Sequence, residues 1–222
     1  MSEFNCEPVA RIYNDYTEKF GIPRQSGLVN EVVSRIVFEP GYRNADALRG
    51  MEEFSHLWLL WVFSEGFRSD RSWSPTVRPP RLGGNERMGV FATRSPNRPN
   101  PIGLSCVELD HIGESDPDGP VIYVRGADLM NGTPILDIKP YITYADSHPE
   151  ARSGFAAASP EILAVRGLEN LPSDADREGV AAVLSQDPRP AYHEDPERIY
   201  GLRFGSMDIH FTVCDGVVTI QP

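Results

Sequence analysis

The segment from Arg94 to Gly103 combines residue types suited to binding a charged ligand. It reads Arg-Ser-Pro-Asn-Arg-Pro-Asn-Pro-Ile-Gly, with three prolines, two arginines and two asparagines. Proline fixes φ and pushes the residue before it toward extended backbone, so a stiff loop is expected here and not a helix. Guanidinium groups match carboxylates or phosphates, and asparagine both donates and accepts hydrogen bonds. The segment therefore predicts a site for a nucleotide-like ligand. The alternative is a turn that proline stiffens for stability alone.

Two other proline-rich segments carry arginines. In Val77–Asn85, Arg78 and Arg81 flank two prolines, and the recurrence of this arrangement favours a second binding segment over a plain turn. The segment 187–192, Asp-Pro-Arg-Pro-Ala-Tyr, shares the pattern, but by itself it indicates only an exposed loop. The same holds for the polar loop Pro23–Gly27.

Two acidic residues stand where they could act on a ligand. Asp128 precedes Asn131-Gly132, a pair typical of a tight turn, and it could bind ribose hydroxyls or an ammonium group together with Thr133. Asp137 and Lys139 alternate along a predicted strand and therefore share one of its faces. Two interpretations of that pair stay open: a simple ion pair, or a positioned acid and base.

The net charge of −11 is unevenly distributed along the chain. Residues 67–101 hold seven arginines and two acidic residues, a local charge of +5, whereas residues 146–197 hold eleven acidic residues and four arginines, a local charge of −7. One part of the protein can attract phosphate while the rest repels it. This distribution favours a bounded contact with nucleic acid over general coating, unless the arginines only solvate a loop.

Composition and spacing exclude several classes of protein. The longest apolar stretch, Leu57–Phe63, is too short to cross a bilayer, and residues 1–20 show no secretion signal. The three cysteines are far apart and the five histidines lack metal-ligand spacing, so neither disulfides nor a metal site is expected. We expect a protein of the reducing cytoplasm.

Most of the first two thirds of the chain has the periodicity of β-strands. Glu31–Phe38 alternates, and Phe54–Phe63, Ile102–Leu109 and Val121–Val124 are rich in β-branched, aliphatic and aromatic residues. Only Ala45–Glu53 suggests a helix. Short strands separated by glycine and proline predict a mainly β fold, a barrel or a sandwich. Neither the glycine fingerprint of a Rossmann dinucleotide site nor a P-loop is present.

The character of the chain changes near Asp146. The acidic part that follows includes a predicted helix, Asp174–Gln186, with Ser173 as its N-cap. Residues 198–220 return to strand-like alternation, with a turn at Asp215-Gly216. We therefore predict two domains, a β domain over residues 1–148 and a small α+β domain over residues 149–222.

Several of these motifs together resemble those of the TsaA-like family. The resemblance runs through KFGIPRQ at 19–25, ADALRGMEEFSHLW at 45–58, residues 76–103 and GTPILDIKPY at 132–141, and DPRPAY at 187–192 resembles the family's C-terminal domain. The resemblance covers most of the chain and is weakest over residues 146–186. It implies a single-sheeted β-barrel that binds S-adenosylmethionine without a Rossmann domain, in a homodimer with the site near its interface. It also implies methylation of N6 of threonylcarbamoyl-adenosine at position 37 of threonine tRNA.

Position by position, the resemblance also implies roles for individual residues. Contacts to the methyl donor fall on Gln25, Ser26, Gly27, Ser64, Glu65, Arg94, Leu104, Asp128 and Leu129. For catalysis we assign proton acceptance to Asp137 or Tyr141, with Lys139 and Arg98 holding the threonyl carboxylate. Contacts to tRNA are assigned to Arg78, Arg81, Arg98, Asn100, Arg189 and Tyr192. A non-catalytic module that senses S-adenosylmethionine or binds RNA is the alternative function.

Overall fold

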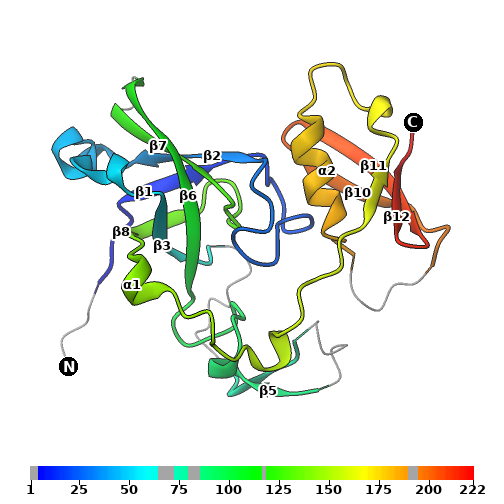
Figure 1. Ribbon diagram of the computed structural model, residues 1–222, viewed down its shortest axis with the longest axis horizontal. Helices are drawn as coiled ribbons and strands as arrows, with labels where there is room; N and C mark the ends of the chain where they lie inside the picture. Colours follow the sequence, from blue (N-terminus) through cyan, green and yellow to red (C-terminus); the bar gives the residue numbers. More distant parts are fainter. Residues whose placement is uncertain (1–4, 65–72, 80–85, 117–118, 190–194) are drawn as a thin grey trace.

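Two β units make up the protein (Figure 1). The computed structural model describes residues 5–64, 73–79, 86–116, 119–189 and 195–222. The first unit is a closed six-stranded barrel, and the second is a four-stranded sheet with one helix against it. The mainly β fold with a small C-terminal sheet domain agrees with the sequence prediction.

Antiparallel neighbours form the whole barrel, in the order β1-β2-β7-β6-β3-β8. Its strands are β1 (Ala10–Tyr13), β2 (Val33–Phe38), β3 (His56–Val62), β6 (Ile102–Asp116), β7 (Gly119–Arg125) and β8 (Pro134–Pro140). Closure is made by β1 and β8, where Ala10 faces Ile135. A two-stranded ribbon, β4 (Thr76–Val77) and β5 (Met88–Gly89), lies outside the barrel.

Alternation of side chains explains the barrel's core. In β2, Ser34, Ile36 and Phe38 are buried, while Val33 and Arg35 are exposed. Because successive strand residues point to opposite faces, one side of each strand fills the barrel. The fully buried side chains in this core are Ala10, Ile12, Ile36, Leu57, Leu59, Ile122, Val124, Leu129 and Ile135.

The helix predicted over Ala45–Glu53 is wrong. The segment forms two short 3-10 turns, Ala45–Leu48 and Met51–Glu53. Gly50 lies between them with φ of 83°, a left-handed conformation that ends one turn before the next begins. The predicted strands are confirmed, and β6 is longer than its sequence pattern indicated.

The C-terminal unit has the strand order β10-β11-β12-β9. It comprises β9 (Ala164–Arg166), α2 (Arg177–Ser185), β10 (Tyr200–Phe204), β11 (Met207–Cys214) and β12 (Val217–Ile220), and the short helix α1 (Thr143–Asp146) precedes it. Helix α2 begins later than predicted, because Asp176 and not Ser173 is its N-cap: the Asp176 carboxylate accepts a hydrogen bond from the Gly179 amide at 2.9 Å. The predicted turn at Asp215-Gly216 joins β11 to β12.

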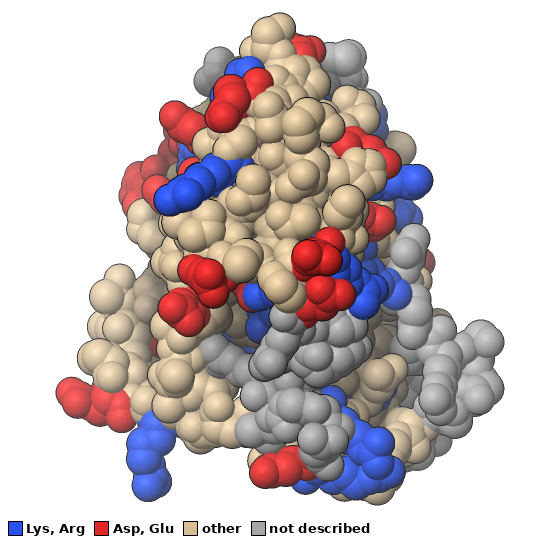
Figure 2. Space-filling model, turned by 90° about the vertical axis from the view of Figure 1, so that its right-hand side faces the viewer, with Lys and Arg blue, Asp and Glu red and all other residues tan. Residues whose placement is uncertain are grey.

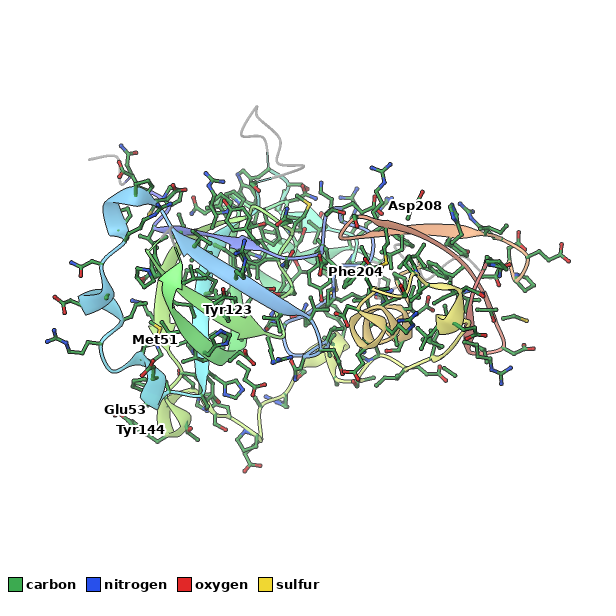
Figure 3. All side chains as sticks on the ribbon, turned by 90° about the horizontal axis from the view of Figure 1, so that it is seen from above. Met51, Glu53, Tyr123, Tyr144, Phe204 and Asp208 are labelled. Carbon is green, nitrogen blue, oxygen red and sulfur yellow. The ribbon has the colours of Figure 1, made fainter. Side chains whose placement is uncertain are left out.

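Residues between β1 and β2 fasten the two units together. Tyr16, Val29 and Val32 belong to the same hydrophobic core as Val180 of α2 and Phe204 of β10. Figure 3 labels Phe204 where the C-terminal unit meets the barrel, whereas Asp208 lies toward the outside. The segment from Asp15 to Val32 is therefore packed on both units.

Gly21 offers a test of this packing. Its φ is +91°, and a Cβ at this position would overlap the Leu202 side chain of β10. Gly21→Ala should therefore combine left-handed strain with overpacking and lower the free energy of unfolding by about 3 kcal/mol. Gly50→Ala is the matched control, since Gly50 has φ of +83° but nothing within 4 Å of the added atom. Urea unfolding should show a loss for Gly50→Ala of only about 1 kcal/mol, and equal losses for both variants would contradict the packing described.

Among the described residues, no helix has the length and apolar character needed to cross a membrane. Cys6, Cys106 and Cys214 are all free thiols. Among these residues, no group of three or more His, Cys, Asp or Glu side chains is placed to hold a metal ion.

Candidate active site

A cavity of about 630 Å³ opens at the end of the barrel where β3 ends and β6 begins. Four segments meet there: the loop Lys19–Gln25, the end of β3 with Phe63 and Ser64, the loop Thr93–Arg98, and the turn from Asp128 to Thr133. Its volume lies within the range of small-molecule sites, roughly 300–1,000 Å³.

Aromatic and aliphatic side chains form one wall of the cavity. Trp61 and Phe63 contact each other edge to face, with ring centroids 4.3 Å apart. Gly103 faces Trp61 across the β3–β6 pair, and its missing side chain leaves room for the indole. Ile102 and Leu104, which are 45% and 54% exposed, continue this apolar surface outward along β6. Such a wall suits the flat face of a nucleobase.

Asp128 supplies a carboxylate deep in the cavity. The Trp61 indole N–H donates to Ser105 Oγ at 2.9 Å, and the Ser105 hydroxyl donates in turn to Asp128 Oδ1. Backbone N–H groups of Ser26 and of Asp128 itself also face the carboxylate. Burial raises the pKa of Asp128, and the hydrogen bond from Ser105, these amides and the charge of Arg94 oppose that rise. The result is a fixed, partly desolvated acceptor for a cation or a hydroxyl.

Arginines form the rim opposite Asp128. Arg94 donates to Gln25 Oε1, which joins the loop 93–98 to the loop 19–25. Arg98 turns back onto its own loop and donates to the carbonyl oxygens of Thr93 at 3.0 Å and Ser95 at 3.4 Å. The predicted stiff cationic loop therefore does form one side of a cavity.

The sequence-predicted donor contacts are largely brought together. Those that line the cavity are Gln25, Ser64, Arg94, Leu104 and Asp128. Ser26 and Gly27 lie just behind them: Ser26 Oγ accepts from the Cys106 amide at 3.2 Å, and the Gly27 amide donates to the Gly126 carbonyl at 2.8 Å. Leu129 is a fully buried barrel residue. Glu65 lies outside the described residues.

The predicted catalytic residues lie on the outer face of the barrel and not in the cavity. Lys139 Nζ and Asp137 Oδ2 form an ion pair at 2.7 Å, with both side chains about half exposed. The Tyr141 ring lies 5.8 Å from that of Trp58. Asp137 nevertheless shares a cross-strand row with the cavity wall, because it faces Leu60 of β3 and Leu60 faces Leu104 of β6. Within one chain, the pair is two strands away from the ligand space.

The predicted RNA contacts fall in different places. Arg98 lines the cavity, and Asn100 and Arg78 are exposed beside it and after β4 respectively. Figure 2, which looks at the C-terminal unit, shows acidic side chains spread over that unit and a group of basic side chains at the foot of the view, at the height of β4 and β5 in Figure 1. Arg189 is only 16% exposed and is paired with Asp187. Arg81 and Tyr192 lie outside the described residues.

Sequence reasoning missed part of the cavity lining. The residues not anticipated include Lys19, Arg24, Trp61, Phe63 and Met130, whereas Asn97 belongs to the predicted loop. The hydrogen-bonded series from Trp61 through Ser105 to Asp128 was also missed, because it joins three segments that only the barrel register brings together. A tryptophan and a glycine in facing strands were the available signal, but their pairing cannot be read before the register is known.

Known proteins match this chain along its whole length. A family model described as the tRNA-methyltransferase O N-terminal domain matches residues 11–147, and a model of the TrmO C-terminal domain matches residues 165–222. The tRNA (adenine(37)-N6)-methyltransferase of Escherichia coli strain K12 is 40% identical over 240 residues, which covers 100% of both chains.

Two relatives from Pseudomonas aeruginosa extend the comparison. A putative S-adenosylmethionine-dependent methyltransferase, RcsF, is 40% identical and covers 93% of this chain and 91% of its own. The crystal structure of TrmO from the same species superposes with a TM-score of 0.76 at 31% identity, covering 99% of this chain and 97% of that one. The family matches agree with the family inferred from the sequence motifs. The chain belongs to the tRNA-methyltransferase O family.

Proposed function

We propose that this protein is an S-adenosylmethionine-dependent tRNA methyltransferase that methylates N6 of threonylcarbamoyl-adenosine at position 37 of threonine tRNA. The observation that carries the proposal is the cavity itself: a partly buried carboxylate, an aromatic wall and an arginine rim converge in about 630 Å³. Relatives whose names specify adenine 37 of tRNA or S-adenosylmethionine support the same activity. In this proposal the barrel, residues 1–148, is a non-Rossmann domain for the methyl donor.

The residues present fit the donor's chemistry. S-adenosylmethionine carries a sulfonium and an ammonium group, a carboxylate, a ribose and a purine. Asp128 suits the cationic groups or the ribose hydroxyls, Arg94 suits the carboxylate, and Trp61 and Phe63 offer an apolar surface for the purine. When bound, the donor supplies an electrophilic methyl group. The protein then contributes alignment and exclusion of water.

The acceptor needs help to react. N6 of the modified adenosine belongs to a urea-like group whose lone pair is delocalised, so it must lose its proton before or during attack. We assign that proton to Asp137 or Tyr141. Lys139 and Arg98 hold the threonyl carboxylate, and Arg78 and Asn100 contact the tRNA backbone.

A homodimer reconciles this assignment with the geometry of one chain. The outer face of β6, β3 and β8 runs from the cavity residues Ile102 and Leu104 to Asp137, and its two β6 side chains are large, apolar and exposed. An exposed apolar patch of this kind marks an interaction surface. We propose that a second copy packs on this face, so that each cavity lies beside the Asp137–Lys139 pair of the partner.

Mixed dimers test the shared site. Asp137→Asn and Arg94→Ala proteins should each be nearly inactive alone. When they are mixed, exchange of subunits should restore about a quarter of wild-type activity, because some dimers then combine one intact cavity with one intact Asp137. The control is each variant alone, taken through the same subunit-exchange procedure. Failure to recover activity, with exchange verified by differently tagged subunits, would show that Asp137 does not act on the cavity of the partner.

The proposed function is tested by mass spectrometry of nucleosides. Threonine tRNA that carries the threonylcarbamoyl modification is incubated with protein and S-adenosylmethionine, digested and analysed. A gain of one methyl group on the modified adenosine is expected, with no gain on tRNA that lacks the modification. Donor binding without any methylation would instead favour a sensor of S-adenosylmethionine.

A further inference from the structure

The C-terminal unit contacts the chain segment that forms one wall of the cavity. The segment from Asp15 to Gln25 connects to β10 and to the turn after it through two hydrogen bonds: the Arg203 amide donates to Glu18 Oε1 at 2.9 Å, and the Gly205 amide donates to the Asp15 carbonyl at 2.8 Å. The Phe20 ring stacks on Phe211 of β11 at 6.4 Å. The same segment then supplies cavity residues between Lys19 and Gln25. Its conformation therefore depends on the second unit as much as on the barrel.

The end of this segment is held by a turn that follows α2. Asp187 has φ of 47°, the left-handed conformation that favours glycine. Arg189 folds back onto it, donating from Nε to Asp187 Oδ1 at 2.8 Å and from its terminal nitrogen to Oδ2 at 2.9 Å. Two parallel charge-assisted hydrogen bonds fix the turn geometrically. As a consequence, the backbone carbonyls of both residues point at one neighbour.

That neighbour is Arg24 on the cavity wall. Its guanidinium donates to the Asp187 and Arg189 carbonyl oxygens, both at 3.1 Å. The next residue, Gln25, accepts a hydrogen bond from Arg94 on the opposite rim, and the charge of Arg94 acts on Asp128. Hydrogen bonds thus join the turn at 187–189 to Arg24, and join the next residue, Gln25, to Arg94, whose charge acts on Asp128 in the cavity.

We propose that the C-terminal unit positions the donor-binding wall, with Asp187 and Arg189 acting through Arg24 as positioning residues. Neither Asp187 nor Arg189 lines the cavity, so their effect on a ligand is indirect. The inference rests on the proposed function, since it needs the cavity to hold the methyl donor. It also changes the role expected of Arg189, whose guanidinium is engaged with Asp187 and mostly buried.

The test is a double-mutant cycle between Arg24 and Arg189. Arg189→Met removes the two hydrogen bonds from the guanidinium to Asp187 that fix the turn. Arg24→Met removes the guanidinium that donates to the two carbonyl oxygens of the turn. Calorimetric titration with S-adenosylhomocysteine should show each single variant binding roughly 5- to 30-fold more weakly, and the double variant binding no more weakly than the weaker single variant. In steady-state assays KM for the donor should rise by a similar factor, with KM for tRNA unchanged.

Arg177→Met is the matched control. Arg177 also donates to backbone carbonyls of the C-terminal unit, those of Leu168, Leu171, Pro172 and Ser173, but it is remote from the cavity lining. It should lower the melting temperature and leave the Kd for S-adenosylhomocysteine unchanged. If Arg189→Met does not fold, Asp187→Asn replaces it in the cycle, because asparagine tolerates the left-handed backbone but lacks the charge.

The possible results distinguish failure of this inference from failure of the proposed function. Additive losses in the cycle would overturn the inference. An Arg189→Met protein with unchanged donor affinity and a raised KM for tRNA would also overturn it, and would indicate that Arg189 contacts RNA. A wild-type protein that binds no S-adenosylhomocysteine would overturn the proposed function itself. Coupled losses in donor affinity alone would support both.

Discussion

Asp128→Asn is expected to bind S-adenosylhomocysteine about 10- to 100-fold more weakly than the wild type, since a charge-assisted hydrogen bond is worth about 1.5–3 kcal/mol. The substitution keeps the shape of the side chain and an oxygen that can accept from Ser105. It removes the negative charge that the cavity presents to a cation. Calorimetric titration at neutral pH measures the change directly.

The pH dependence of the same complex gives an independent test. Because burial raises the pKa of Asp128, its carboxyl takes up a proton at a higher pH than an exposed aspartate. Wild-type affinity should therefore fall as the pH is lowered through this raised value, and the Asp128→Asn profile should be flat there. For folding the sign is opposite: the neutral form is favoured in the native state, so this group's contribution to stability is largest below the ordinary pKa of 3.8 and declines as the pH rises through the raised value.

Asp110→Asn is the matched control. Its carboxylate also accepts hydrogen bonds, from Arg125 Nε at 2.6 Å and from His111 Nδ1 at 2.7 Å, but it lies on the outside of β6 away from the cavity. It should not change donor affinity. An Asp128→Asn protein that binds the analogue as the wild type does would show that this carboxylate does not contact the ligand.

Gly103→Ala is expected to damage the cavity from its apolar side. An added Cβ would overlap the Trp61 indole, so the ring must move out of the wall. Overpacking of this kind lowers the free energy of unfolding by about 1–3 kcal/mol. The ring also donates to Ser105, which donates to Asp128, so the shift should weaken donor binding by roughly tenfold or more. Urea unfolding and calorimetric titration measure the two effects.

Gly89→Ala provides the comparison. Gly89 lies at the end of β5 with φ of −57°, and nothing lies within 4 Å of an added Cβ. Stability and affinity should both stay close to wild type. If Gly103→Ala also left stability and donor affinity unchanged, the close packing of the Trp61 indole against Gly103 would be contradicted.

Local sequence patterns predicted the strands well, because the alternation or apolar run that marks a strand lies within the strand itself. Alternation identified Glu31–Phe38 and the apolar run identified Phe54–Phe63, and both form barrel strands. Closure of the barrel could not be predicted from such local patterns, since it depends on Ala10 of β1 pairing with Ile135 of β8. Register between segments so far apart is set by which faces can be buried together.

The two errors in helix prediction have local physical causes. Ala45–Glu53 has helix-forming composition, but Gly50 adopts a left-handed conformation that divides it into two turns. At α2 the Asp176 carboxylate accepts a hydrogen bond from the Gly179 amide, so the helix starts after Asp176 and not after Ser173. The residue that caps a helix is set by a single hydrogen bond, and amino-acid composition does not show which candidate will form it.

The candidate site was predictable in its loops and not in its walls. Proline and arginine spacing identified the loop that carries Arg94 and Arg98, and the Asn131-Gly132 turn drew attention to Asp128. The indole of Trp61 and the brace on Arg24 come from partners far away in the sequence. The Trp61 contact exists only once the barrel strands are in register, and the Arg24 contacts exist only after both units have folded against each other.

A crystal structure of the protein with S-adenosylhomocysteine tests the central claim most directly. We predict ligand density inside the cavity between the loops 19–25 and 93–98, with a polar group of the ligand in hydrogen-bond contact with Asp128 and its purine against the wall that contains Trp61 and Phe63. Density for the ligand at any other place, with this cavity unfilled, would contradict the account.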